Sequence, residues 1–198
     1  MSNRWQKLSF TVLFFLLAGC AATAQITNTA RSSLEQELLI RALDRAMAKL
    51  DVQQLRDKTV TVDFYGLTPD KDFAKEYFTA WLQSQKIQIA LDPKLAQLRL
   101  KVFASVLAVD QGQSFIGSPS FTVPVIGIGI PEIALFKNIE HSGHAELKMF
   151  LVNAKSGQFI SESIPATGST EHDDYTVLIV IHFTRTDLQE QRWDLGAD

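Results

Sequence analysis

The sequence predicts an α+β fold, a two-layer domain in which a mixed or mainly antiparallel sheet carries two helices packed on one face. Two stretches, 32–50 and 68–82, repeat apolar residues at the spacing of an amphipathic helix, whereas most of the later chain alternates as β-strands do. Helices and strands in this order are typical of helices packed on a sheet. We expect one such domain over 31–184 and a polar tail over 185–198.

The first helix is predicted to begin at Ser32 or Ser33. Ser32 and Glu35 have the spacing of a capping box, in which each side chain accepts a hydrogen bond from the other residue's backbone N–H. One face is apolar, and charged residues, including Asp44, are expected mostly on the other face. The apolar positions are Leu34, Leu38, Leu39, Ala42, Leu43, Ala46 and Leu50.

A strand over 59–65 should precede the second helix. Thr68 is the expected cap of this helix, with Pro69 at its first position. An aromatic stripe follows, and we interpret it as the side that packs on the sheet rather than as a ligand face. Its members are Phe73, Tyr77, Phe78, Trp81 and Leu82.

The remaining chain is predicted to be rich in β-strands. The run YTVLIVIHF, 175–183, is nearly continuous and β-branched, which predicts a central strand buried on both faces. The other expected strands cover 86–91, 98–108, 145–151 and 159–163.

The segment 110–131 interrupts this regular pattern, because it contains four glycines and three prolines among its polar and apolar residues. Proline confines a strand to an edge or a bulge. We consider three interpretations: an irregular edge strand with its apolar side chains in the core, a surface that docks on a partner, and a lid over a ligand pocket. The candidate docking residues are Phe115, Ile116, Phe121, Val123, Ile126 and Ile128.

The first residues have the order of a secretory signal. Arg4 and Lys7 form a basic start, an apolar run follows over 8–18, and the chain's single cysteine comes after two small residues. The apolar run is shorter than the roughly 20 residues that span a bilayer. We therefore predict a signal peptide over 1–19. Two other interpretations of these residues stay open. One is an ordinary signal peptide that happens to contain a cysteine, and the other is a signal anchor that is not cleaved.

Leu17-Ala18-Gly19-Cys20 resembles the lipobox of bacterial lipoprotein precursors. This resemblance implies diacylglycerol on the Cys20 sulfur, cleavage before Cys20 and usually a third acyl chain, such as palmitate, on the new amino terminus. Several acyl chains on one residue anchor a protein far more firmly than one chain does. Residues 20–30 would then form the lipidated cysteine and its tether. Ala21, by resemblance to Gram-negative lipoproteins, points to the outer membrane and the periplasm.

Charge and cysteine content exclude several classes of function. The formal net charge is −3, and loss of Arg4 and Lys7 with the signal makes it more negative. An acidic chain without clusters of Lys or Arg argues against a nucleic-acid partner. With Cys20 used as the anchor, the mature chain has no thiol for a disulfide, a nucleophile or a metal.

Few residues suggest chemistry. His141 and His144 would share a metal only in a turn, and we interpret 140–144 as a surface hairpin. The polar cluster 171–174 is interpreted as a solvated loop, and His182 as a core or edge histidine. No catalytic residues, metal site or cofactor are predicted, so we do not expect an enzyme. A hydrolase or metalloenzyme built on these residues is the third hypothesis.

The run Thr27–Gln36 (TNTARSSLEQ), followed by Leu38-Leu39 and by Asp44-Arg45-Ala46, resembles the opening of a family of uncharacterised bacterial lipoproteins of proteobacterial type. The resemblance implies a location and a general architecture but no site residues.

Together these features favour a non-catalytic, lipid-anchored envelope lipoprotein that binds another envelope protein. The alternative is a periplasmic module that binds a lipid or small ligand between sheet and helices.

Overall fold

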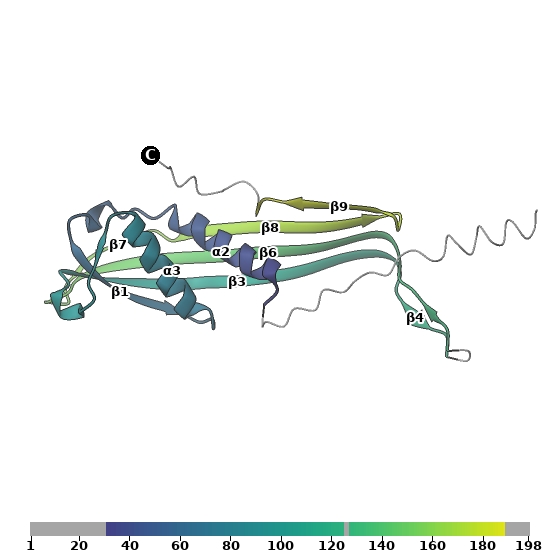
Figure 1. The fold of residues 1–198 in the computed structure, drawn as a ribbon, viewed down its shortest axis with the longest axis horizontal. Helices are drawn as coiled ribbons and strands as arrows, with labels where there is room; N and C mark the ends of the chain where they lie inside the picture. Colours follow the sequence, from purple (N-terminus) through teal and green to yellow (C-terminus); the bar gives the residue numbers. More distant parts are fainter. Residues whose placement is uncertain (1–30, 125–126, 189–198) are drawn as a thin grey trace, which may run out of the picture. The chain divides into compact units, whose positions relative to one another are not determined.

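The computed structural model of the chain describes residues 31–124 and 127–188. Within these residues, the compact unit that begins at Ser32 contains two α-helices, a curled mixed sheet of seven strands and a separate two-stranded ribbon (Figure 1). The α+β prediction is therefore confirmed. The predicted signal peptide and tether, 1–30, and the last part of the predicted tail, 189–198, lie outside the described residues.

The sheet has the order β2-β1-β3-β6-β8-β9, and β7 also pairs with β6. Strand β1 is parallel to β2 and β3, whereas all other pairs are antiparallel. The strands are β1 (Thr59–Gly66), β2 (Gln88–Ile89), β3 (Leu98–Ser118), β4 (Phe121–Thr122), β5 (Gly129–Ile130), β6 (Ile133–Asn153), β7 (Phe159–Glu162), β8 (Ala166–Val177) and β9 (Ile181–Thr186).

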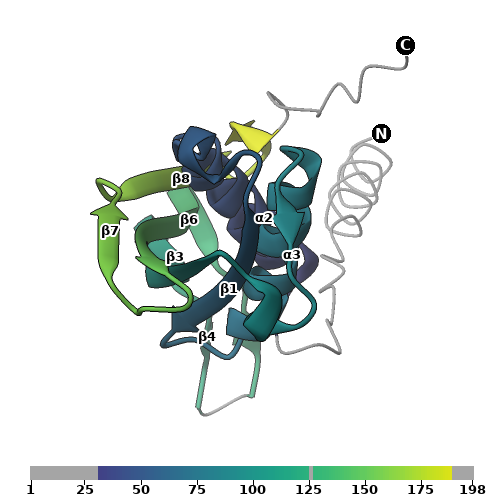
Figure 2. The ribbon, with the colours of Figure 1, turned by 90° about the vertical axis from the view of Figure 1, so that its left-hand side faces the viewer.

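Two strands are much longer than the others. β3 and β6 have 21 residues each and pair from Leu98 opposite Asn153 to Ser118 opposite Ile133. β1 accompanies β3 only as far as Ala104. Beyond Ala104 the sheet continues as the four strands β3, β6, β8 and β9, which we call the distal sheet (Figure 1). Figure 2 shows the curl of the sheet.

The first helix forms as its cap predicts. α2 (Ser33–Met47) follows Ser32, whose N–H donates to Glu35 Oε2 at 2.7 Å, while the Glu35 N–H donates to Ser32 Oγ at 3.2 Å. This reciprocal pair satisfies two backbone donors that a helix start otherwise leaves without partners. The predicted capping box is therefore confirmed.

The second helix begins later than predicted. α3 (Lys71–Ser84) follows Asp70, so Thr68 is not its cap and Pro69 is not its first residue. The Thr68 hydroxyl donates to Asp70 Oδ2 at 3.0 Å, and the Asp70 N–H donates to the Thr68 hydroxyl oxygen, also at 3.0 Å. These local bonds hold a turn before the helix, which explains why the prediction was wrong.

Two glycines let α2 lie directly on the sheet. A Cβ atom at Gly143 would stand 2.6 Å from the Leu38 carbonyl oxygen, and one at Gly168 would stand 2.6 Å from the Ala46 nitrogen and overlap the Ala42 carbonyl. Any larger residue would therefore push the helix away. The Thr170 hydroxyl, fully buried, donates to the Leu38 carbonyl at 3.0 Å at the same contact.

The core joins both helices to the central strands in one cluster of buried side chains. α2 and α3 supply its largest members, as the apolar periodicity of 32–50 and 68–82 predicts. Representative members are Leu43, Met47, Val60, Phe78, Leu82, Leu100, Val102 and Leu147. Phe73, from the predicted aromatic stripe, is instead 53% exposed.

Asp44 is an exception to the predicted polar face of α2, because it is only 4% exposed. The Tyr77 hydroxyl of α3 donates to Asp44 Oδ1 at 2.8 Å, and Arg41 Nη1 lies 3.8 Å from Asp44 Oδ2. This pair joins the two helices. Burial, and then the hydrogen bond and charge of Asp44, raise the pKa of Tyr77 from 10.0 to about 12.

The Tyr77–Asp44 pair predicts an alkaline loss of stability. Because the folded pKa is raised, the pair's contribution is complete below pH 10 and is lost as the pH rises through about 12. Tyr77→Phe should cost about 1 kcal/mol near neutral pH and should flatten this alkaline decline. Urea unfolding of both proteins over this pH range measures the effect. Parallel declines would show that Tyr77 does not couple to folding.

The folded region continues past residue 184, where the tail was expected to begin. β9 extends through Thr186, and Leu188 is 8% exposed. Arg45 of α2 donates two hydrogen bonds to Asp187. Its Nη1 donates to the Asp187 carboxylate, and its Nη2 donates to the Asp187 backbone carbonyl at 2.9 Å. The Glu171 N–H of β8 also donates to Asp187 Oδ1 at 2.9 Å. These bonds attach the end of β9 to the helix and the sheet.

Candidate functional site

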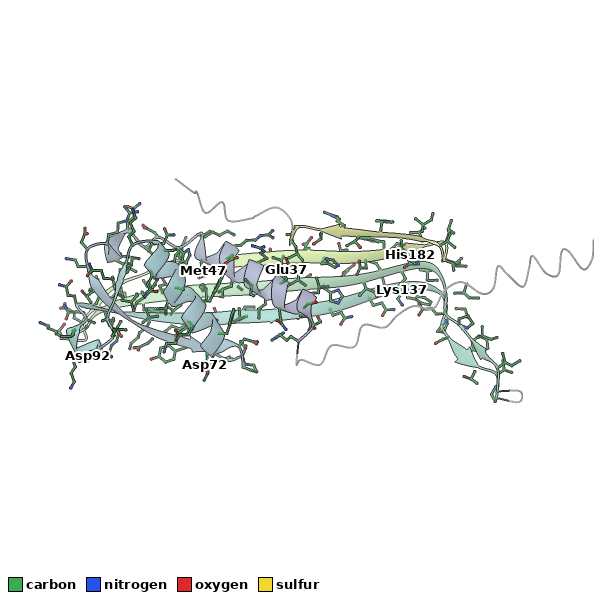
Figure 3. The ribbon with its side chains drawn as sticks, viewed as in Figure 1. Glu37, Met47, Asp72, Asp92, Lys137 and His182 are labelled. Atoms are coloured by element: carbon green, nitrogen blue, oxygen red, sulfur yellow. The ribbon has the colours of Figure 1, made fainter. Side chains whose placement is uncertain are left out.

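Large apolar side chains gather, exposed, at the far end of the distal sheet. We call this group the apolar tip. Its members come from two parts of the chain, the end of β3 through the ribbon to the start of β6, and the β8–β9 turn with the start of β9. They are Ile116, Phe121, Ile128, Ile133, Leu135, Leu178, Ile179, Val180, Ile181 and Phe183, which are between 41% and 76% exposed. Figure 3 places Lys137 and His182 at this end of the sheet, and Asp92 at the other end.

The β8–β9 turn is held against the start of β6. The Leu178 N–H donates to the Leu135 carbonyl and the Ile179 N–H to the Ala134 carbonyl, each at 2.9 Å. Leu178 and Ile179 have φ angles of 49° and 71°. Side chains other than glycine adopt such angles at a cost, and β-branched ones rarely adopt them. The fold thus keeps strained apolar residues exposed at this turn.

The β4–β5 ribbon carries the other half of the tip. It leaves the sheet after Ser118, next to Gly117, where a Cβ atom would stand 3.1 Å from Ala134 Cα. Phe121 pairs with Ile130 across the ribbon, and the Val123 N–H donates to the Ile128 carbonyl at 2.9 Å. The ribbon projects from the end of the long strands in Figure 1.

Of the predicted docking residues, Ile116, Phe121 and Ile128 are 62%, 50% and 57% exposed. Phe115 and Val123 are half-buried, and Ile126 lies outside the described residues. Residues 110–118 do form an edge of the sheet, paired with β6 on one side only and with a register shift between Ile116 and Gly117, but their apolar side chains are exposed or half-buried. The interpretation that placed this segment's side chains in the core is therefore wrong for the described residues.

The run 175–183 is not a central strand buried on both faces, as the sequence predicted. It contains the end of β8, the turn 178–180 and the start of β9, which is the last strand of the sheet. Tyr175 stacks on Phe183 with ring centroids 4.9 Å apart, and Phe136 lies 6.4 Å from Tyr175. These rings extend the apolar tip along one face of the distal sheet.

The histidines lie within strands. Residues 140–144 belong to β6 and 171–174 to β8, so neither the predicted hairpin nor the predicted loop exists. His141 faces His172 across the two strands, with ring centroids 6.4 Å apart. His144 lies on the other face of β6, with its Nε2 3.8 Å from an Asp110 oxygen. No three His, Cys, Asp or Glu side chains among the described residues are placed to hold a metal ion.

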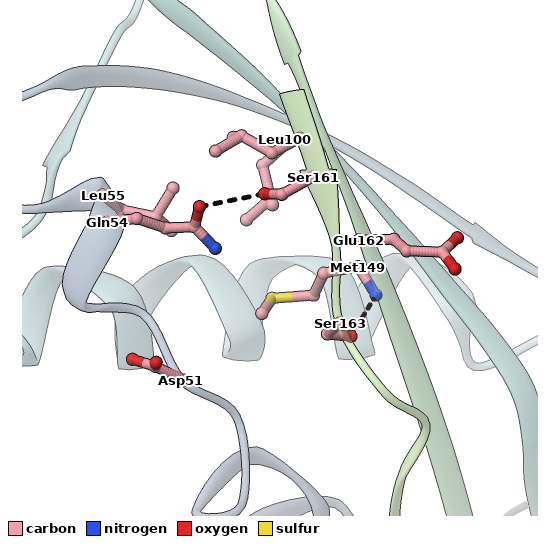
Figure 4. A pocket seen from close by; sticks show the side chains of 9 residues that line it. Asp51, Gln54, Leu55, Leu100, Met149, Ser161, Glu162 and Ser163 are labelled. Carbon is pink, nitrogen blue, oxygen red and sulfur yellow. Dashed lines mark hydrogen bonds between the residues drawn. The ribbon is translucent and has the colours of Figure 1, made fainter. Parts of the chain in front are cut away.

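A small cavity lies between η1 (Gln53–Leu55) and strands β3, β6 and β7 (Figure 4). Its volume is about 10 Å³, which is the space of a single water molecule. The Ser161 hydroxyl donates to Gln54 Oε1 at 2.9 Å, and the Met149 N–H donates to Ser163 Oγ at 2.9 Å, at its wall. This cavity is too small to hold the lipid or ligand of the alternative hypothesis.

A shallow open hollow of about 450 Å³ lies at the end of β1, lined by Tyr65, Leu67, Phe103 and Lys71 among others. Tyr65 and Phe103 stack with centroids 4.9 Å apart. The hollow contains apolar surface, the Lys71 ammonium and the Ser105 hydroxyl, which donates to Glu146 Oε1 at 2.7 Å.

No protein-family model matches the chain, and no curated protein matches it significantly. None of the helices in the described residues is long and apolar enough to cross a membrane.

Sequence reasoning found one half of the apolar tip, in 110–131, but missed the other half, the turn 178–180. This turn has no Gly, Pro, Asn or Asp, the residues that usually mark a hairpin turn. The continuous apolar run was the only available signal, and an apolar run alone indicates a buried strand equally well.

Proposed function

We propose that this chain is a non-catalytic lipoprotein of the cell envelope, anchored in the outer membrane through acylated Cys20 and facing the periplasm. Its folded domain binds another envelope protein through the apolar tip. The lipobox resemblance and the resemblance to uncharacterised bacterial lipoproteins support the anchor. The tip supports the binding role, because soluble monomers rarely keep a large contiguous apolar patch in water without a function.

The main observation in support of this role is that two segments far apart in sequence expose apolar residues at the same end of the distal sheet. The bonds from Leu178 and Ile179 to Leu135 and Ala134 join the β8–β9 turn to the start of β6, which carries the tip residues Ile133 and Leu135. A scattered set of exposed apolar residues would need no explanation, but a joined set at the end of a long sheet does. Binding of a partner would cover it.

We also propose that the domain has two layers, with α2 and α3 packed on one face of the sheet. The joint core cluster supports it, because residues of both helices pack there with β1, β3 and β6. In this arrangement the outer end of the distal sheet, with its tip, projects beyond the helices and remains accessible to a partner.

The binding role is tested by affinity purification of the full-length protein from its own membrane. Ile128→Ser combined with Ile179→Ser should lower the recovery of the co-purifying partner by about ten-fold or more, equal to about 1.4 kcal/mol of binding free energy. The melting temperature should stay within a few degrees, since both side chains are more than half exposed.

Leu67→Ser combined with Leu91→Ser is the matched control. These leucines are 99% and 102% exposed but lie outside the apolar tip, so the partner's recovery should not change. Equal loss in both variants, or no loss in the tip variant, would contradict binding through the tip. A large drop in melting temperature in the tip variant would show that the tip is part of the core.

A further inference from the structure

The distal sheet has two open edges. β3 loses its neighbour β1 after Ala104 but continues to Ser118, and β9 is the last strand of the sheet. Within 31–124 and 127–188, no strand pairs with the outer side of β3 over 106–118 or with the outer side of β9 over 181–186. Each edge therefore presents a row of backbone N–H and C=O groups that can pair with another strand.

Neither edge carries the lysine, proline or cluster of charges that usually protects an edge, and the register shifts of β3 lie only at the two ends of 106–118, between Ala104 and Val106 and between Ile116 and Gly117. Proteins commonly place lysine, proline or several charges on an edge strand. Between 106 and 118 the only charged side chain is Asp110, and there is no proline or lysine. β9 contains one permanently charged side chain, Arg185. A 13-residue edge, 106–118, with so little charge is a template for strand pairing.

The strand directions allow the two edges to pair with each other. β3 is antiparallel to β6, β6 to β8, and β8 to β9, so β9 runs opposite to β3. Two copies placed side by side in the same orientation would bring β9 of one copy antiparallel to β3 of the next. This pairing continues the alternation of the distal sheet without a break.

The two charged residues of these edges lie on the same face. Gly112, Glu140, Asp173 and Arg185 stand opposite one another in one row across the four strands. Asp110 is two residues from Gly112 on β3, so its side chain points to the same face as that of Arg185. An antiparallel pairing offset by two residues from this row places Arg185 of one copy opposite Asp110 of the next.

Both charged groups are exposed, although Arg185 also stands opposite Asp173 of its own chain. The Asp110 side chain is 78% exposed, and its own-chain contact is a His144 nitrogen at 3.8 Å. Arg185 lies on the exposed outer strand. Opposite charges directly across an antiparallel pair stabilise it, whereas like charges destabilise it.

We propose that this chain self-associates by pairing β9 of one copy with residues 106–118 of β3 in the next copy. The two edges differ, so the contact is heterologous, and repetition closes a ring or extends a strip. All copies keep one orientation, which suits copies anchored in one membrane; this last point rests on the proposed function. Apolar tips of neighbouring copies then lie side by side and form one continuous surface.

A charge exchange tests the proposal with the full-length protein in detergent micelles, its protein mass measured by light scattering after size exclusion. The wild type should form oligomers. Asp110→Arg and Arg185→Asp should each lower the oligomer population by about ten-fold. The double variant should restore the wild-type mass, because misfolding in the single variants cannot produce such a rescue.

Glu76→Arg, a charge reversal at an exposed position of α3, is the matched control and should leave the mass unchanged. A monomeric wild type would overturn the proposal, as would a double variant no better associated than the single ones. Either result would leave the proposed function standing, because recovery of the partner and acylation of Cys20 are measured separately on the same preparations.

Discussion

Replacing Gly168 with alanine is expected to detach α2 from the sheet and to unfold much of the protein. The added Cβ would overlap the Ala42 carbonyl and stand 2.6 Å from the Ala46 nitrogen, both of which are helix backbone. Backbone cannot move aside as a flexible side chain can, so helix and sheet must separate. Because α2 contributes much of the core, we expect a loss of about 3 kcal/mol or more.

Urea unfolding followed by circular dichroism measures this loss. Gly129→Ala is the matched control, because a Cβ at Gly129 meets no atom within 4 Å, and its unfolding midpoint should stay close to that of the wild type. Gly143→Ala should be strongly destabilising as well, since its Cβ would stand 2.6 Å from the Leu38 carbonyl. A Gly168→Ala protein as stable as the control would contradict the direct packing of α2 on β8.

Replacing Cys20 is expected to have the largest effect in the cell. Cys20→Ser removes the sulfur that would carry diacylglycerol, and the chain has no other cysteine to acylate. The amount in the outer-membrane fraction should fall by about ten-fold or more, because weak contacts cannot replace several acyl chains. Fractionation with labelled fatty acid measures both location and acylation.

Ala21→Asp is the control that separates the anchor from the sorting signal. By resemblance to Gram-negative lipoproteins, aspartate after the cysteine should keep the fatty acid but move the protein away from the outer membrane. If Cys20→Ser left the outer-membrane share unchanged, another part of the chain would have to attach it there.

The sequence was most informative where a local pattern decides the structure. Ser32 and Glu35 form the predicted capping box, because both partners lie within one helical turn. Apolar periodicity also identified both helices and most of the core. The start of α3 was predicted too early because Thr68 and Asp70 bond to each other in a turn that precedes the helix.

The sequence was least informative where distant residues decide. Asp44 is buried because Tyr77, on another helix, donates a hydrogen bond to it. Polar residues of 140–144 and 171–174 suggest loops, yet they continue strands that pair with each other. The turn at Leu178 and Ile179 depends on bonds to β6, so the run around it resembled one buried strand.

The candidate site could be predicted in part for the same reason. Glycine and proline mark 110–131 as unusual, which led to Ile116, Phe121 and Ile128. Nothing local marks the turn 178–180 as exposed. Only the fold brings the two apolar segments to one end of the distal sheet, and only the strand order reveals its two open edges.

The mass of the N-terminal peptide of the protein taken from its own membrane tests the central claim most directly. A peptide that begins at residue 20, with diacylglycerol on its sulfur and an acylated amine, is the predicted result. A chain that begins at residue 1, or a cysteine without lipid, would contradict the anchor and with it the envelope location from which the binding role was inferred.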